Sequence, residues 1–304
     1  MISLGLLIGL LIIIAAILIA ALSKPLNLHK NFYIKLFFVL FLLSSISEIL
    51  SYLTSLSIFS IAGSMSFFFT VAFVLLHSSE VLGNRKTAIF FIIAFLFGLI
   101  SELLSVIYGL YYYTIPSFFF GMVPLATPIS WVFIIYVSYI LADLFLFGFG
   151  GEKPKKTDNL WFLLGLLILT SSISGLIAVN LDMILDPISI PPNVAQWVYS
   201  TVGPYFGVPI SNFVGWFLVT TLVVFIFRCY EVLSSSKDFK IELNTYSYLY
   251  IIVVYLIYFL FNAVKAFNLG RIEYILIGTT TMMPFILIGL LALILYKKRE
   301  DMIR

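Results

Sequence analysis

Charge is scarce in this chain. Only 10% of its 304 residues are Asp, Glu, Lys or Arg, whereas 62% are hydrophobic and the mean hydropathy is +1.15. About a quarter of an ordinary soluble protein is charged. The scarcity excludes a water-soluble domain and predicts an integral membrane protein. The net charge of +3 comes from the loops and gives no reason to expect a nucleic-acid partner.

Cysteine and histidine are also scarce. Cys229 is the single cysteine, so no disulfide can form within the chain. His29 and His77 are far apart in the sequence and lack the spacing of metal ligands. We therefore expect no metal and no other cofactor.

Hydrophobic runs, in contrast, recur along the whole chain and are long enough to cross a hydrocarbon core of about 30 Å. They predict an all-α, polytopic transmembrane helical bundle of about nine spans, with eight as the alternative, forming a single domain over residues 1–304. The predicted spans are 2–22, 32–53, 58–77, 88–110, 124–147, 159–180, 205–228, 247–267 and 274–296.

The basic residues predict an orientation. Fifteen of the 17 Lys and Arg residues follow odd-numbered spans, and only Lys265 and Arg271 fall on the other side. Because cytoplasmic loops are enriched in Lys and Arg, we expect the N-terminus outside and the C-terminus in the cytoplasm. The predicted location is the cell membrane, with the lipid bilayer around a multi-pass protein.

Four acidic residues lie near the outer ends of predicted spans. Glu48 is late in the second span, Glu102 is late in the fourth, and Asp182 and Asp186 lie just past the sixth. Acids at such depths are costly and mark functional sites by default. Pro187 is expected to end the helix at Asp186. The alternatives are hydrogen bonds to neighbouring Ser and Thr for the two glutamates, and a simple end-of-helix turn for the two aspartates.

The loops at the same end are aromatic. An aromatic belt at the bilayer surface explains such residues without a site, and we expect it for Tyr111, Tyr112, Trp161 and Tyr199. Asp143 and His77 are expected to be solvated at cytoplasmic helix ends. The residues expected to line a site are Tyr113, Trp131, Trp197, Tyr205, Asn212 and Trp216.

Several motifs between about residues 100 and 216 carry a resemblance. They are Glu102 with G-L-Y-Y-Y-T, G-M-V-P-L followed by Trp131, Tyr136 and Tyr139, N-L-D-M-I-L-D-P, and Y-F-G-V-P-I-S-N-F-V-G-W. In them the chain resembles the membrane-embedded carotenoid biosynthesis proteins. The archaeal members include bisanhydrobacterioruberin hydratase, and the bacterial members include a γ-carotene 1'-hydroxylase-type hydratase.

The resemblance implies addition of water across the terminal C=C of a long polyene (carotenoid) substrate, with other carotenoid biosynthesis enzymes as protein partners. Where the family usually continues with W-x-W after its D-P segment, this chain has Gln196, Trp197, Val198 and Tyr199. We therefore expect its contacts with the substrate end to differ.

Hydration of such an end group requires an acid for the alkene, stabilisation of a tertiary cation and a base for the attacking water. We assign the acid and base roles to Asp182 and Asp186, the orientation of water to Asn212 and the tuning of the pair to Glu102. Glu48 with Glu102 is the second catalytic pair to consider. Each aromatic face can stabilise a cation by about 0.5–2 kcal/mol.

Three other functions remain open. The spacing N-x-D-x-x-x-D is similar to that of intramembrane prenyltransferases, but these need a second acidic motif for magnesium diphosphate, and Asp238 with Glu242 is predicted on the opposite face. A lycopene cyclase also begins by protonating an end-group alkene. A transporter or structural protein would need broken helices near the midplane, for which Gly278 and Pro284 are the signs.

Overall fold

The computed structural model describes residues 4–22, 28–54, 56–148, 159–192, 195–234 and 245–303. The chain forms two compact units, residues 1–89 and 90–304, which are described separately. Asp238 and Glu242 lie outside the described residues, as do seven of the fifteen basic residues that predict the orientation, namely Lys24, Lys153, Lys155, Lys156, Lys237, Lys240 and Arg304.

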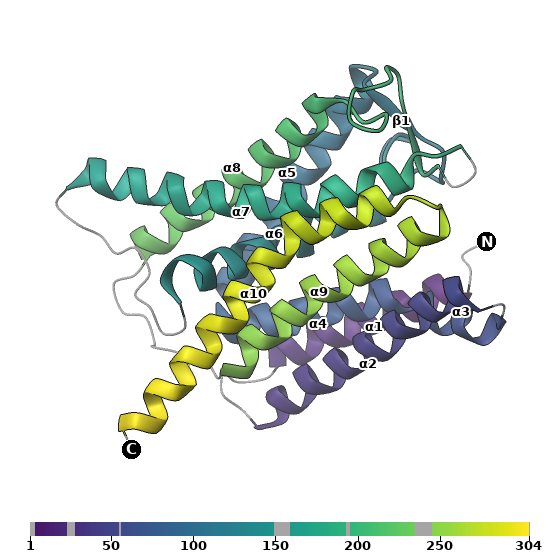
Figure 1. Ribbon diagram of the computed structural model, residues 1–304. Helices are drawn as coiled ribbons and strands as arrows, with labels where there is room; N and C mark the ends of the chain where they lie inside the picture. The colour runs from purple at the N-terminus through teal and green to yellow at the C-terminus, as the bar shows by residue number, and fades with distance from the viewer. Residues whose placement is uncertain are drawn as a thin grey trace. The chain divides into compact units, whose positions relative to one another are not determined.

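Helices make up nearly all of the described chain (Figure 1). The first unit holds α1 (Leu4–Leu22), α2 (Leu28–Leu53), α3 (Ser57–Gly63), α4 (Ser66–Val81) and the start of α5 (Asn84–Ile107). The second unit holds the rest of α5, β1 (Tyr111–Tyr113), α6 (Ala126–Phe147), α7 (Leu160–Ser189), β2 (Trp197–Tyr199), α8 (Ile210–Ser234), α9 (Thr245–Asn268) and α10 (Ile272–Ile303).

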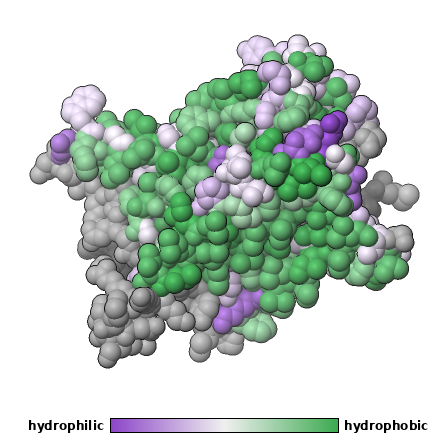
Figure 2. All heavy atoms as spheres, in the orientation of Figure 1, coloured by the Kyte–Doolittle hydropathy of each residue, from purple (hydrophilic) through white to green (hydrophobic). Residues whose placement is uncertain are grey.

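Within the described residues, eight helices are long and apolar enough to cross a membrane, with α3 and α4 together counting as one over Ser57–Val81. The described part of α1 adds a shorter apolar helix, Ile8–Leu22. Figure 2 shows hydrophobic residues over the sides of α9 and α10, where a lipid-facing surface needs them. The protein is therefore a polytopic helical membrane protein. Its orientation and its single-domain organisation stay predictions.

The first unit packs through phenylalanine rings and buries some polar groups. The rings of Phe38 and Phe41 contact that of Phe73 on α4. His77 packs on the same Phe73 and is buried. The expectation of a solvated His77 is therefore wrong, because α4 continues past it to Val81.

Helix α6 is the most buried span of the second unit, and its last turns contain an ion pair. Asp143 lies 2.5 Å from a guanidinium nitrogen of Arg228, and their side chains are only 3% and 2% exposed. The guanidinium also lies 4.7 Å from the centre of the Tyr139 ring. The prediction of a solvated Asp143 is wrong because α8 extends to Ser234 and so carries Arg228 inside the bundle.

A short two-stranded ribbon joins two loops that are far apart in the sequence, and an all-α prediction did not include it. Strands β1 and β2 pair antiparallel, with Tyr111 opposite Tyr199, Tyr112 opposite Val198 and Tyr113 opposite Trp197. In Figure 1 the ribbon lies at the end of the second unit where α5 ends and α8 begins. Because side chains alternate along a strand, Tyr111 and Tyr113 share one face and Tyr112 takes the other.

Helix α7 does not end at Asp186, contrary to the prediction. It runs to Ser189 with Pro187 inside it. Asp182 and Asp186 are therefore helical and one turn apart, and residues one turn apart face the same way. Proline removes one backbone donor from such a helix, which leaves the carbonyl of Met183 without its usual partner.

The segments α5–β1–α6 and α7–β2–α8 are two copies of one motif, a repeat that was not among the predictions from sequence. Their loops contain F-F-G-M-V-P-L at 119–125 and Y-F-G-V-P-I at 205–210. In each loop a Phe and the following Gly adopt positive φ, at Phe120 and Gly121 and at Phe206 and Gly207. Positive φ at both central residues defines a type I′ turn. Each turn leads through Val-Pro into a helix.

Equivalent residues of the two copies meet each other. Tyr112 pairs with Val198 at the centre of the ribbon. The Trp131 and Trp216 rings lie 4.3 Å apart, and Asp143 pairs with Arg228. Members of each pair are separated by 85 or 86 positions in the sequence. When a residue of one copy contacts the equivalent residue of the other copy, the two copies are related by a two-fold axis. The two copies therefore face each other across a local two-fold axis.

Candidate active site

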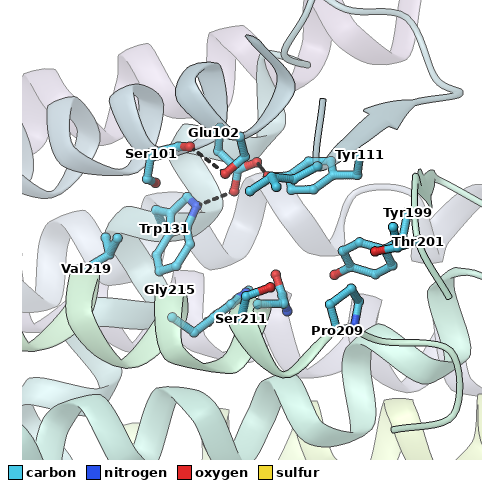
Figure 3. A pocket seen from close by; sticks show the side chains of 14 residues that line it. Ser101, Glu102, Tyr111, Trp131, Tyr199, Thr201, Pro209, Ser211, Gly215 and Val219 are labelled. Carbon is cyan, nitrogen blue, oxygen red and sulfur yellow. Dashed lines mark hydrogen bonds between the residues drawn. The ribbon is translucent and has the colours of Figure 1, made fainter. Parts of the chain in front are cut away.

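A cavity of about 90 Å³ lies where the two copies meet near the ribbon (Figure 3). Helices α5, α6 and α8, strands β1 and β2 and the loop before α8 form its walls. Its lining mixes hydroxyl, indole and carboxyl groups. The lining residues are Ser101, Glu102, Ser105, Leu110, Tyr111, Trp131, Tyr199, Thr201, Pro209, Ser211, Asn212, Gly215, Trp216 and Val219.

Glu102 is the acid that lines this cavity directly. Its Oε1 accepts a hydrogen bond from the Trp131 indole at 2.8 Å, and its Oε2 accepts from the hydroxyls of Tyr111 and Tyr113. Figure 3 shows the Glu102 carboxyl between Trp131 and Tyr111. Both oxygens of the Glu102 carboxyl are therefore held by hydrogen bonds at the cavity wall.

Asp182 and Asp186 form a second acidic centre on α7. The amide nitrogen of Asn212 donates to both, at 2.8 Å to Asp182 Oδ2 and 2.6 Å to Asp186 Oδ2. The Tyr199 hydroxyl also donates to Asp186 Oδ2. Asp182 is 0% exposed and Asp186 is 3% exposed, so both acids are buried. Neither lines the cavity; Asn212 and Tyr199 connect them to it.

One oxygen of this centre has no partner. Asp182 Oδ1 is buried and makes no hydrogen bond with any residue that the structure describes. Two buried carboxyls so close together are stabilised when they share a proton instead of carrying two charges. Asp182 Oδ1 is thus the position left for a proton or a water molecule.

The ribbon supplies the phenols that bind both centres. Tyr111 and Tyr199 are opposite each other with ring centres 5.7 Å apart, and Tyr113 lies against Trp197 at 6.4 Å. Burial raises the pKa of the Tyr111 and Tyr113 hydroxyls, and the nearby Glu102 raises it further. Burial and then Asp186 raise the pKa of Tyr199 in the same direction. All three phenols therefore stay protonated and able to donate.

The belt expected at the bilayer surface is wrong for Tyr111 and Tyr199, whose hydroxyls bind acids. The expected belt agrees with two other residues, because Tyr112 on the outer face of the ribbon is 55% exposed and Trp161 is 82% exposed. The signal that could have separated them is the alternation Y-x-Y and W-x-Y, because only every second residue of a strand faces the same side.

The two indoles at the cavity differ in their hydrogen bonds although they are equivalent. Trp131 donates to Glu102. The Trp216 N–H donates to no residue of the described ranges, and the ring lines the cavity. Its N–H is therefore available to a bound molecule.

The structure brings together eight of the ten predicted site residues. These are Glu102, Tyr113, Trp131, Asp182, Asp186, Trp197, Asn212 and Trp216. Tyr205 does not line the cavity; its hydroxyl donates to the Met183 carbonyl at 2.9 Å. Glu48 lies in the first unit, where the Ser66 hydroxyl donates to it, and its catalytic role stays a prediction.

Among the described residues, no group of three or more His, Cys, Asp or Glu could hold a metal ion. Each acidic centre is instead surrounded by hydrogen-bond donors, which compete with a metal for the same oxygens. The arrangement suits transfer of protons more than coordination of a cation.

The fold and the site together define a multi-pass membrane protein with two acidic centres beside a small, indole-lined cavity at one end of its second unit. A family model described as carotenoid biosynthesis protein matches residues 62–285, more than half of the chain. The chain therefore belongs to the carotenoid biosynthesis protein family. No curated protein and no solved structure matches it.

Proposed function

We propose that the protein adds water across the terminal C=C of an acyclic carotenoid end group, as a bisanhydrobacterioruberin-type hydratase. The observation that carries the proposal is the Asp182–Asn212–Asp186 cluster, which Tyr199 connects to an indole-lined cavity. Family membership provides the substrate class. The cell membrane is the proposed location, and other enzymes of carotenoid biosynthesis are the proposed partners.

In the proposed reaction the aspartate pair loses one proton through Tyr199. For this the Tyr199 hydroxyl turns from Asp186 toward the terminal alkene and gives its own proton to it, while the proton that the pair shares passes from Asp186 to the Tyr199 oxygen. A hydrogen bond between a phenol and a carboxyl serves transfer in either direction. Water then bonds to the tertiary cation, and its surplus proton returns through Tyr199. The C=C gains H and OH, and the pair ends in its initial protonation state.

Glu102 and the two indoles stabilise the intermediate cation. The Glu102 carboxylate lines the cavity with Trp131 and Trp216. Opposite charge and aromatic faces both favour a cation, and in a water-poor site such fixed groups are worth more than in water. Asn212 and the Trp216 N–H are placed to orient the attacking water.

The lining favours hydration over cyclisation. Cyclisation begins with the same protonation but must keep water from the cation. Here the cavity carries the hydroxyls of Ser101, Ser105, Thr201 and Ser211, all of which can hold water. A cyclase would be expected to line this space with apolar side chains.

Expression in a host that accumulates an acyclic carotenoid tests the proposal. Wild type should yield a product heavier by one water in chromatography with mass spectrometry. Asp186→Asn and Asp182→Asn should each lose activity by about 10²–10⁴, the usual worth of a general acid or base, at unchanged protein level. A product of unchanged mass indicates a cyclase, and a prenylated product a prenyltransferase. Near wild-type turnover in both variants would make Glu102 with Glu48 the pair to test.

A further inference from the structure

Pro187 creates a gap in the hydrogen bonding of α7 beside the two aspartates. In a helix the N–H of each residue donates to the carbonyl four positions earlier, and Pro187 has no N–H. The carbonyl concerned belongs to Met183, which lies between Asp182 and Asp186. The Tyr205 hydroxyl donates to this carbonyl at 2.9 Å. A side chain from the loop before α8 thus replaces the missing backbone donor.

The loop holds Tyr205 firmly in this position. Tyr205 opens the second type I′ turn, which is closed by a 2.8 Å hydrogen bond from Val208 N–H to the Tyr205 carbonyl. Its ring contacts those of Phe206 and Phe213, each with centres 5.0 Å away. Burial raises the pKa of Tyr205 to about 12, so the hydroxyl remains a donor at any ordinary pH.

The first copy of the motif provides an internal comparison. There the residue after the acid is Leu103, which has a backbone N–H, whereas Pro187 follows Asp186 in the second copy. The residue that opens the first turn is Phe119, which has no hydroxyl, whereas Tyr205 opens the second. The tyrosine hydroxyl is therefore present in the copy that contains the proline and absent from the copy that does not.

We propose that Tyr205 is a positioning residue whose hydroxyl replaces the hydrogen bond that Pro187 cannot make, and so keeps Asp182 and Asp186 in one helical turn facing Asn212. This role differs from the substrate contact expected from the sequence. The catalytic consequence rests on the proposed hydratase function, whereas the hydrogen-bond replacement itself does not.

A double-mutant cycle in the full-length protein tests the proposal. The variants are Tyr205→Phe, Pro187→Ala and the double variant, with Tyr112→Phe on the exposed face of the ribbon as the control for loss of a hydroxyl. Tyr205→Phe should lower kcat at least about tenfold with little change in KM. It should also lower the melting temperature in detergent by about 2–4 °C, the shift that a loss of about 1 kcal/mol causes in a protein of about 150–250 residues.

The double variant should recover both values, because the Pro187→Ala substitution restores the backbone N–H that the Met183 carbonyl needs. Pro187→Ala alone and Tyr112→Phe should behave like wild type. If the double variant is as impaired as Tyr205→Phe, or if Tyr205→Phe changes KM instead of kcat, Tyr205 acts on the substrate and the proposal is wrong. If wild type makes no hydrated product, the proposed function fails, and recovery of the melting temperature still decides the positioning role.

Discussion

Tyr199→Phe is the most direct test of the proposed proton route. Tyr199 lines the cavity and donates to Asp186, so the substitution removes the link between the buried pair and the substrate while keeping the ring. If protons pass through this hydroxyl, turnover should fall by about 10²–10⁴. The lost hydrogen bond to a carboxyl should also cost about 1.5–3 kcal/mol of unfolding free energy.

The assay is product formed per folded protein in membranes, with the folded fraction measured by size exclusion in detergent. Tyr112→Phe is the matched control, since Tyr112 belongs to the same ribbon but is 55% exposed and faces away from the site. Its turnover should equal that of wild type. If Tyr199→Phe keeps turnover within about threefold of wild type, the route through Tyr199 is refuted and Asp186 must reach the substrate another way.

Three other features of the second unit can be tested by unfolding or turnover measurements. The buried phenols bind their protons more tightly in the folded protein than in the unfolded chain, so the free energy of unfolding should fall as the pH rises above about 10, the ordinary pKa of tyrosine. An unfolding midpoint that stays constant up to about one pH unit above this pKa would contradict the prediction. Gly215→Leu should abolish turnover without unfolding the protein, because a Cβ at this position meets no atom within 4 Å and the rest of the side chain would extend into the cavity that Gly215 lines. Gly165→Leu on the exposed side of α7, where a Cβ also meets no atom within 4 Å, should have no effect. Asp143→Asn should lower the free energy of unfolding, measured in denaturant, by about 3–5 kcal/mol, because it leaves the charge of Arg228 without its partner. The double variant with Asp143→Arg and Arg228→Asp should recover much of this loss, since the two positions are equivalent. No recovery would count against the local two-fold axis.

Composition and hydrophobic runs were enough to predict the membrane helices. Long apolar segments have few alternatives in a bilayer, where backbone polar groups must be satisfied within a helix. The acids were found because charge inside such segments is costly and therefore informative. Glu102, Asp182 and Asp186 are the acids among the eight predicted residues that lie close together, and their catalytic roles stay predictions.

The errors arose where tertiary contacts override a local rule. Pro187 signals a helix end, but the Tyr205 hydroxyl satisfies the carbonyl that it exposes, so the helix continues. Tyr111 and Tyr199 have the composition of an interfacial belt, but strand pairing aims them at Glu102 and Asp186. Neither strand taken alone shows which distant loop it pairs with. The signal lies in the comparison of the two loops, because F-G-M-V-P at 120–124 and F-G-V-P at 206–209 are similar to each other.

The duplication explains why the two acidic centres differ. Phenols of the ribbon bind one acid in each copy, Glu102 in the first and Asp186 in the second. One turn before Asp186 the second copy has Asp182, and one turn before Glu102 the first copy has Gly98. A side chain at position 98 would meet the Trp131 side chain at 2.7 Å, so the indole that binds Glu102 also excludes a second acid there.

Each copy is therefore suited to one half of the proposed chemistry. In the first copy both oxygens of a single carboxyl accept hydrogen bonds, which fixes a negative charge for a cation. In the second copy two carboxyls lie side by side and one oxygen stays open, which suits gain and loss of a proton. A symmetric pair of either kind would lack one of these functions. We infer that divergence of the two copies, from a shared arrangement of acid, strand and indole, produced a site that can both create a cation and hold it until water adds.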